Sequence, residues 1–430
     1  MFFVSVASLR SAVSFSDCGV HPDIVRSLAA AGIDNPFPIQ AAALPDAISG
    51  RDLLGRGRTG SGKTLAFGLA MLTRLAGRPA QPKQPNGLIL VPTRELAMQV
   101  VDALMPHAKA VNVSLRLITG GIPYKKQIDS LRRGVHILVA TPGRMMDLAE
   151  KGEADLSKVS ITVLDEADQM ADMGFLPDVQ KLLDMTSPKG QRMLFSATLD
   201  RDVDKIVKRY LKNPVEHATS PEVSPVDTME HHVLLVHPMD KDQVVAEIAS
   251  REGRTIFFVR TQRGADALAE KLTARGVSVG SLHGGKSQGV RTKTLQHFKD
   301  GITQTLVATD VAARGIHVDD ISLVVHFDAP ADHKDYLHRS GRTARAGATG
   351  ISVLLANPRH QKEVLLLTNR SGIKPSVSRV RPSSVELVAV TGSQEPTDIP
   401  WTPPKVREDR PVRRSRPKQR NNRSRGAKRR

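Results

Sequence analysis

The sequence predicts an α/β protein with two domains, each built on a mainly parallel sheet. Short apolar runs alternate with helical segments along most of the chain, which is typical of parallel strands joined by helices. A length of 430 residues also exceeds one ordinary domain. The alternation lapses over 217–228, where the sequence is rich in Pro, Ser and Glu. We therefore expect a disordered leader at 1–14, domains at 15–216 and 229–371 with a linker between them, and a basic disordered tail at 372–430.

The first domain begins with a helical segment at 22–31 and a Pro-rich turn at 36–40. A short strand at 52–55 is followed by Gly57-Arg58-Thr59-Gly60-Ser61-Gly62-Lys63-Thr64 and by a helix at 63–75. Strand, Gly-rich loop and helix are the context of a phosphate-binding loop, whereas a plain Gly/Ser turn is the alternative. Glycine lets successive N–H groups face an anion. Lys63 supplies a charge for the phosphates, and the Thr64 hydroxyl is suited to Mg²⁺.

Polar motifs follow the remaining apolar strands of this domain. Parallel sheets bind ligands at the carboxyl ends of their strands, so these motifs are expected at one edge. The strands at 88–91, 115–118, 136–140, 161–164 and 193–195 lead into motifs at 92–96, 119–121, 141–144, 165–168 and 196–198.

The acidic motif Asp165-Glu166-Ala167-Asp168 ends one of these strands. A carboxylate there can hold Mg²⁺, and a neighbouring carboxylate can orient or deprotonate an attacking water. A cluster that only caps a helix is the alternative, since acidic residues favour helix N-termini. The phosphate loop upstream favours the catalytic interpretation.

The second domain repeats the pattern, with strands at 255–259, 277–279, 305–308, 323–327 and 350–355. Its segment 338–345 contains three arginines and a histidine. The planar guanidinium group suits phosphate oxygens, so this cluster can act as a finger on a γ-phosphate bound in the first domain. Domain closure would then gate hydrolysis. A solvated basic helix face is the alternative.

Charge points to a polyanionic partner. The formal net charge is +18, and residues 405–430 contain 13 basic and 2 acidic side chains. Nucleic acid fits this composition better than a membrane surface. No apolar run reaches the roughly 18 residues of a spanning helix, and Cys18 is the only cysteine, so we expect a cytoplasmic protein.

Eight motifs in one order resemble the motif set of the DEAD-box ATP-dependent RNA helicases, and the compact build is similar to the bacterial RhlE-like group. The likeness covers about 15–367 and implies two tandem RecA-like domains. The motifs lie at 36–40, 57–64, 92–96, 141–144, 165–168, 196–198, 309–315 and 338–345.

The resemblance also implies roles for individual residues. Gln40 would read the adenine edge and Phe15 would stack on the base, which gives ATP as the nucleotide. Lys63, Asp165, Glu166, Arg342 and Arg345 would be catalytic, with Thr64 and Asp165 holding Mg²⁺ partly through water. Asp168, Ser196, Thr198, Asp310 and His338 would couple the ATP state to RNA. Thr93, Arg94, Gly121, Thr141, Arg144, Gln288, Arg291 and Thr309 would bind the RNA backbone.

Three positions depart from the family pattern. Gly57 replaces Ala in the phosphate loop, and Phe37 replaces a Thr near Gln40. His317 stands where many members have an Asp that touches the ribose, so this sequence lacks that carboxylate.

Only 3% of residues are aromatic, so base stacking is scarce and backbone gripping is expected. We predict an RNA-dependent ATPase that remodels short RNA duplexes or ribonucleoprotein, with ribosome-assembly or RNA-decay complexes as candidate partners. An ATP-dependent RNA clamp or assembly scaffold is the alternative, and a DNA translocase is disfavoured.

Overall fold

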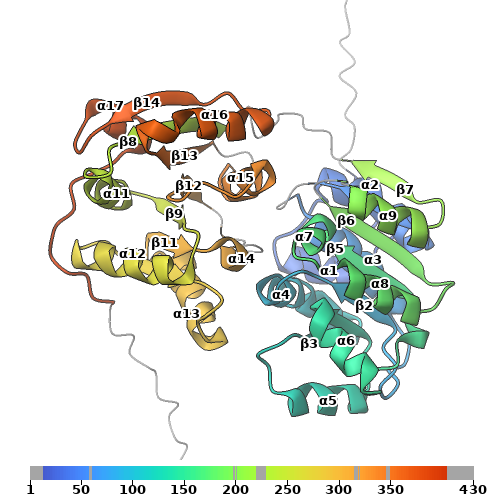
Figure 1. Cartoon of the computed structure of the whole chain (residues 1–430). Helices are drawn as coiled ribbons and strands as arrows, with labels where there is room; N and C mark the ends of the chain where they lie inside the picture. The colour runs from blue at the N-terminus through green and yellow to red at the C-terminus, as the bar shows by residue number, and fades with distance from the viewer. Residues whose placement is uncertain are drawn as a thin grey trace, which may run out of the picture.

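A computed structural model describes residues 13–57, 61–196, 199, 201–218, 229–313, 318, 320–344 and 349–403. These residues form two α/β domains, as the sequence predicts (Figure 1). Almost all of the predicted leader and the end of the predicted tail lie outside them. No helix of the described segments is long and apolar enough to cross a membrane.

The first domain is built on a seven-stranded sheet in which every neighbouring pair is parallel. The strand order is β3-β4-β2-β5-β6-β1-β7. The central strands are apolar and buried on both faces, which explains their continuous apolar runs. The strands are β1 (Leu53–Arg56), β2 (Gly87–Leu90), β3 (Leu115–Ile118), β4 (Ile137–Ala140), β5 (Ile161–Asp165), β6 (Gln191–Ser196) and β7 (Val215–Ala218).

Two apolar layers flank this sheet. One contains side chains of α1 to α4, and the other contains side chains of α5 to α9. The helices are α1 (Pro22–Ala30), α2 (Pro38–Ser49), α3 (Lys63–Leu75), α4 (Arg94–Ala110), α5 (Tyr124–Arg133), α6 (Pro142–Glu150), α7 (Ala167–Asp172), α8 (Leu176–Met185) and α9 (Arg201–Tyr210).

The second domain has a seven-stranded parallel sheet with the order β10-β11-β9-β12-β13-β8-β14. Replacing β1–β7 by β8–β14 in chain order converts one sheet into the other, so the domains share a topology. Motifs that follow equivalent strands therefore lie at equivalent sheet edges. The strands are β8 (Met229–Val236), β9 (Arg254–Phe258), β10 (Val279–Leu282), β11 (Thr305–Ala308), β12 (Ile321–His326), β13 (Gly350–Ala356) and β14 (Ser376–Val380).

Helices cover both faces of the second sheet as well. Side chains of α11, α12 and α17 form one apolar cluster, and side chains of α13 to α16 form two others. The helices are α11 (Lys241–Ala249), α12 (Gln262–Ala274), α13 (Gln288–Lys299), α14 (Asp310–Ala313), α15 (His333–Ser340), α16 (Gln361–Arg370) and α17 (Val385–Thr391).

The predicted start of the tail at 372 needs correction. Strand β14 pairs with β8, and α17 buries Leu387 in the apolar cluster of the second domain. The chain then runs along α12, where the N–H groups of Asp398 and Trp401 donate to the carbonyls of Arg275 and Thr273. Few apolar residues mark this segment because an edge strand and a short helix each bury only one or two side chains. The predicted linker also begins two residues early, since 217 and 218 belong to β7.

Candidate functional site

The phosphate loop lies between β1 and α3, as predicted. Gly62 caps α3 with φ of +89°, a left-handed conformation that favours glycine. A Cβ atom at this position would lie 2.5 Å from Nε2 of Gln40, so the close approach also excludes a side chain. Arg58, Thr59 and Gly60 lie outside the described residues. The described end of the loop therefore packs against the Gln40 amide at the start of α3.

Lys63 points back into the loop and is buried, with 5% of its side chain exposed. Its ammonium group donates to the carbonyl oxygen of Gly57 at 2.7 Å and lies 3.3 Å from Oε1 of Glu166. Burial lowers the pKa of Lys63, but Glu166 and Asp165 raise it, and the net shift is upward. The side chain therefore remains a cation at neutral pH.

The acidic motif at the end of β5 lies beside this lysine. Burial raises the pKa of Asp165 to about 7, since Lys63 offsets only part of the burial effect and Glu166 adds to it. Glu166 has φ of +53°, which is rare for a residue with a side chain and is common at active sites. The N–H of Asp168 donates to the Ser196 hydroxyl at 3.2 Å, which joins the ends of β5 and β6. Thr198 lies outside the described residues.

The buried Asp165 carboxyl group, whose pKa is raised, is suited to binding a cation. Asp165 supplies a hard oxygen ligand at the sheet edge, and Thr64 follows Lys63 in the first turn of α3. Mg²⁺ takes few protein oxygens and completes its shell with phosphate and water. The residues present therefore fit Mg²⁺ bound together with a nucleotide.

The Gln40 amide is fixed at both ends. Its Oε1 accepts the N–H of Phe37 at 2.9 Å, and its Nε2 donates to the Gly62 carbonyl at 3.0 Å. Phe37 is 57% exposed, and Cδ2 of its ring would lie 2.7 Å from a Cβ atom added to Gly62. Phe15, in contrast, is 2% exposed and packs in the core of the first domain. The two faces of its ring are already covered, so base stacking on Phe15 needs another conformation and stays a prediction.

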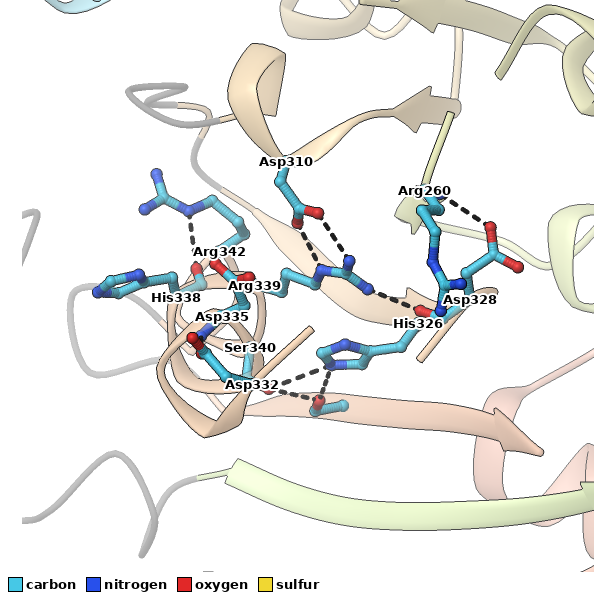
Figure 2. A network of polar contacts seen from close by, with 11 residues as sticks. Arg260, Asp310, His326, Asp328, Asp332, Asp335, His338, Arg339, Ser340 and Arg342 are labelled. Atoms are coloured by element: carbon cyan, nitrogen blue, oxygen red, sulfur yellow. Dashed lines mark hydrogen bonds and ion pairs between the residues drawn. The ribbon is translucent and has the colours of Figure 1, made fainter. Parts of the chain in front are cut away.

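In the second domain, the guanidinium group of Arg339 holds two loops together (Figure 2). Its Nε and Nη2 donate to the two carboxylate oxygens of Asp310 at 2.5 and 2.7 Å. Its Nη1 donates to the carbonyl oxygen of Asp328 at 2.7 Å. Arg339 of the 338–345 cluster therefore has a structural role as the ion-pair partner of Asp310. Asp310 was predicted to be a coupling residue.

His338 and Arg342 of the cluster lie at the end of α15 and directly after it. Nε of Arg342 donates to the His338 carbonyl at 3.2 Å, and the residue is mostly buried. Nδ1 of His338 is buried with no hydrogen-bond partner among the described residues. Arg345 lies outside the described residues, as do Arg314 to His317. The roles of Arg342 and Arg345 as arginine fingers therefore stay predictions, and so does the effect of His317 on the ribose contact.

Tyr336 on α15 and two histidines on the sheet form a buried network, and we expect this network to make the second domain sensitive to acid. Nδ1 of His231 lies 2.8 Å from the Tyr336 hydroxyl, and the ring of His326 stacks on Tyr336 at 4.7 Å. Burial lowers the pKa of His231 to about 4 and lowers the pKa of His326 well below its ordinary value. The unfolded chain binds these protons near pH 6.5. Stability is therefore complete above about pH 6.5 and is lost as pH falls towards 4.

We expect the melting temperature of the second domain to fall between pH 7.5 and pH 5, and to fall less in His231→Gln. The matched control is His360→Gln, because His360 is exposed and should keep the full acid dependence. Thermal unfolding at several pH values measures both. Equal acid dependence of wild type and His231→Gln would contradict the assignment.

Residues predicted to bind RNA converge from both domains. Oε1 of Glu95 on α4 lies 2.9 Å from Nη2 of Arg291 and 3.1 Å from Nε2 of Gln288, both on α13. The α15 ammonium group of Lys334 lies 3.9 Å from Asp172 on α7. Helices α4 and α7 therefore face α13 and α15 across the domains (Figure 1). Sequence reasoning missed Glu95, because contacts between domains leave no periodic signal.

In the first domain, the residues predicted to bind RNA pack closely against two arginines, Arg94 and Arg144. A Cβ atom on Gly121, where φ is +77°, would collide with Nη1 of Arg94, so only glycine fits there. Arg144 donates to the Ile122 carbonyl at 3.3 Å and stacks on the Tyr124 ring. Sequence reasoning missed Tyr124. The hydroxyl of Thr93 caps α4, Thr141 occupies the N-cap of α6, and Thr309 directly precedes α14.

Comparison with known families agrees with this geometry. Residues 37–206 match the DEAD/DEAH box helicase model, and residues 240–347 match the helicase conserved C-terminal domain. The chain belongs to the DEAD-box helicase family. This DEAD-box chain is 39% identical over 361 residues to the ATP-dependent RNA helicase DeaD of Mycobacterium tuberculosis, a match that covers 84% of the chain and 63% of that relative. The chain thus spans less than two thirds of the relative's length.

Solved structures confirm the tandem RecA-like fold of this DEAD-box chain. S. cerevisiae Dbp5 bound to RNA and ADP BeF3 is 29% identical, with a TM-score of 0.75 over 86% of this chain and 96% of that chain. A Dbp5 variant bound to Nup159, Gle1, IP6 and ADP is 28% identical, with a TM-score of 0.57 over 87% and 98%. The present structure therefore resembles the first complex more than the second.

Proposed function

We propose that the protein is an ATP-dependent RNA helicase that couples hydrolysis to local unwinding or remodelling of RNA. One observation carries this proposal: the same two domains hold two different polar clusters. The first domain contains the cluster of Lys63, Asp165 and Glu166, and the contact of Glu95 with Gln288 and Arg291 joins the two domains. The first cluster suits a triphosphate, and the second gathers basic and amide groups suited to a ribose-phosphate backbone.

ATP and Mg²⁺ would bind at the phosphate loop. Lys63 would contact the β- and γ-phosphates, while Thr64 and Asp165 would hold Mg²⁺ partly through water. When bound, Mg²⁺ offsets phosphate charge. Glu166 would orient the attacking water, because its carboxylate is held beside Lys63 at the mouth of the loop. Arg342 would approach the γ-phosphate from the second domain.

Domain closure would connect the two sites. The α4–α13 and α7–α15 contacts join elements that carry RNA-binding and nucleotide-binding motifs. Greater similarity to the RNA-bound Dbp5 complex than to the Dbp5 complex with Nup159 and Gle1 supports a closed arrangement. Closure would bend the bound strand away from duplex geometry, and hydrolysis would reopen the domains.

An ATP-dependent RNA clamp is the second candidate, because the buried Glu95–Arg291 pair links the two domains directly. Binding to ribosome-assembly or RNA-decay complexes and a cytoplasmic location belong to this proposal as well. They rest on the family and on the basic composition.

The test compares ATPase rates with no nucleic acid, with RNA and with DNA of equal length, and then follows strand release from a short RNA duplex. A helicase shows an RNA-specific rise in ATPase rate and multiple-turnover strand release. A clamp shows RNA retention with an ATP analogue and little release. Equal rates with and without RNA would contradict both candidates.

A further inference from the structure

The second domain contains a cavity of about 530 Å³ where several of its strands end. The lining comes from segments at or after the carboxyl ends of β8, β9, β12 and β13, and from α16. Strands β8, β12 and β13 are the counterparts of β1, β5 and β6, which carry the phosphate loop, Asp165 and Ser196 in the first domain. The cavity therefore occupies the position in the second sheet that the nucleotide site occupies in the first.

The segment that corresponds to the phosphate loop is unsuited to a triphosphate. Only His237-Pro238-Met239-Asp240 separates β8 from α11, and it contains no glycine. An anion-binding nest needs successive N–H groups that turn towards the ligand, whereas proline fixes its φ and has no N–H. This position of the second sheet is thus available for a different kind of ligand.

The floor of the cavity is apolar. Leu355 and Val364 are each 4% exposed and belong to apolar clusters of the second domain. Phe327 and Leu367 are partly buried against the same clusters. The volume falls within the roughly 300–1,000 Å³ of ligand pockets, which combine apolar walls with a few polar groups. An apolar side chain or ring is therefore the group that fits the floor.

Two cations line this cavity, and neither Lys241 nor Arg260 forms an ion pair among the described residues. The Lys241 ammonium group donates to the Phe327 carbonyl at 3.0 Å and lies 3.7 Å from the centre of the Phe327 ring. Burial lowers the pKa of Lys241, and Asp328 and Asp242 offset only part of that effect. Oδ2 of Asp328 accepts the backbone N–H of Arg260 at 2.8 Å (Figure 2). A partly buried cation in this state favours an incoming carboxylate.

The mixture of charges favours a peptide over a nucleic acid. Asp328 and Glu363 line the same cavity and would repel a chain of phosphates. A peptide can bring a single carboxylate beside an apolar side chain, and its backbone N–H groups can donate to acidic residues of the lining. Charge and shape therefore point to an acidic peptide with an apolar anchor.

We propose that this cavity is a docking site for an acidic peptide segment of a partner protein. An apolar side chain of the peptide fills the floor between Val364 and Leu367, and a neighbouring Asp or Glu of the peptide pairs with Lys241. This inference goes beyond the proposed function, because no residue assigned to ATP or RNA lines the cavity.

The experiment selects random short peptides, displayed on phage, against the full-length chain. Selected peptides are then synthesised with a fluorophore, and fluorescence anisotropy measures their binding. We expect wild type to enrich peptides in which Asp or Glu stands next to an aliphatic or aromatic residue. For such a peptide, Lys241→Gln should weaken binding about ten-fold, and Leu367→Ala should weaken it about five-fold.

Charge reversal makes the result specific. Lys241→Glu should lose the acidic peptide and should bind a version of that peptide in which Lys replaces the acidic residue, because attraction is restored with the signs exchanged. Lys362→Gln is the matched control. Lys362 is an exposed lysine of α16 that does not line the cavity, so this variant should bind the peptide as wild type does.

Equal peptide binding by wild type, Lys241→Gln and Leu367→Ala would overturn the proposal, and so would a selection that enriches no acidic peptide. A loss of RNA affinity in Lys241→Gln also overturns it, because the cation would then serve the nucleic acid. Unchanged RNA-stimulated ATPase in both variants, with peptide binding weakened, supports a docking site that is separate from the helicase sites. Thermal unfolding of each variant excludes a folding defect.

Discussion

Glu166→Gln is expected to lower the rate constant for ATP hydrolysis by about 10²- to 10³-fold while ATP and RNA still bind. Glutamine has the same shape and keeps an oxygen that can accept from Lys63, which lies 3.3 Å from the carboxylate. It cannot take a proton from water. The loss should therefore appear in kcat and in single-turnover rates.

The same substitution should change the neighbouring carboxyl group. Glu166 contributes to the raised pKa of Asp165, so its neutralisation should move that pKa back towards the ordinary value. Asp165 then ionises at lower pH, which favours cation binding. ATP affinity at neutral pH is therefore expected to hold or to increase slightly. Equilibrium binding of a fluorescent ATP analogue between pH 6 and pH 8 measures this.

Glu216→Gln is the matched control, because Glu216 forms an exposed pair with Arg56 at the end of the same sheet. It should hydrolyse ATP at the wild-type rate. Wild-type turnover by Glu166→Gln would show that this carboxylate has no part in water activation. The site would then depend on Asp165 and Lys63 alone.

Local patterns predicted the elements that carry the nucleotide site. The strand before the phosphate loop, the loop and the helix 63–75 follow from apolar runs and glycine placement, and α3 has these bounds in the structure. Asp165 and Ser196 fall at the ends of β5 and β6 because parallel strands bring their carboxyl ends to one edge. The fold and the positions of these motifs are thus encoded locally.

Contacts between distant segments could not be predicted in the same way. Arg339 was grouped with phosphate-binding arginines, yet the topology places it between Asp310 and Asp328, and these residues use its donors. Glu95 lies in a recognised motif, but its partners are far along the chain on α13. Single-sequence patterns report periodicity and composition, and neither encodes which charges meet across domains.

Arg339→Leu is expected to destabilise the second domain by about 3 kcal/mol or more, the largest stability effect we predict. The side chain is 3% exposed and makes three hydrogen bonds, two of them to Asp310. Its loss leaves the Asp310 carboxylate without its cation. The guanidinium carbon also lies 5.3 Å from the centre of the Phe258 ring, and leucine replaces neither this contact nor the donors.

Arg339→Lys should lie between wild type and Arg339→Leu, because an ammonium group is a point charge that cannot form the two parallel bonds of the guanidinium fork. Arg359→Ala, at an exposed position before α16, should have no effect. Urea unfolding of the full chain measures the free energy of the second-domain transition.

RNA-stimulated ATPase should fall with Arg339→Leu even below the unfolding transition, since Asp310 and the end of α15 lose their common anchor. A variant with full stability and full stimulation would mean that the loops after β11 and β12 are held by other contacts.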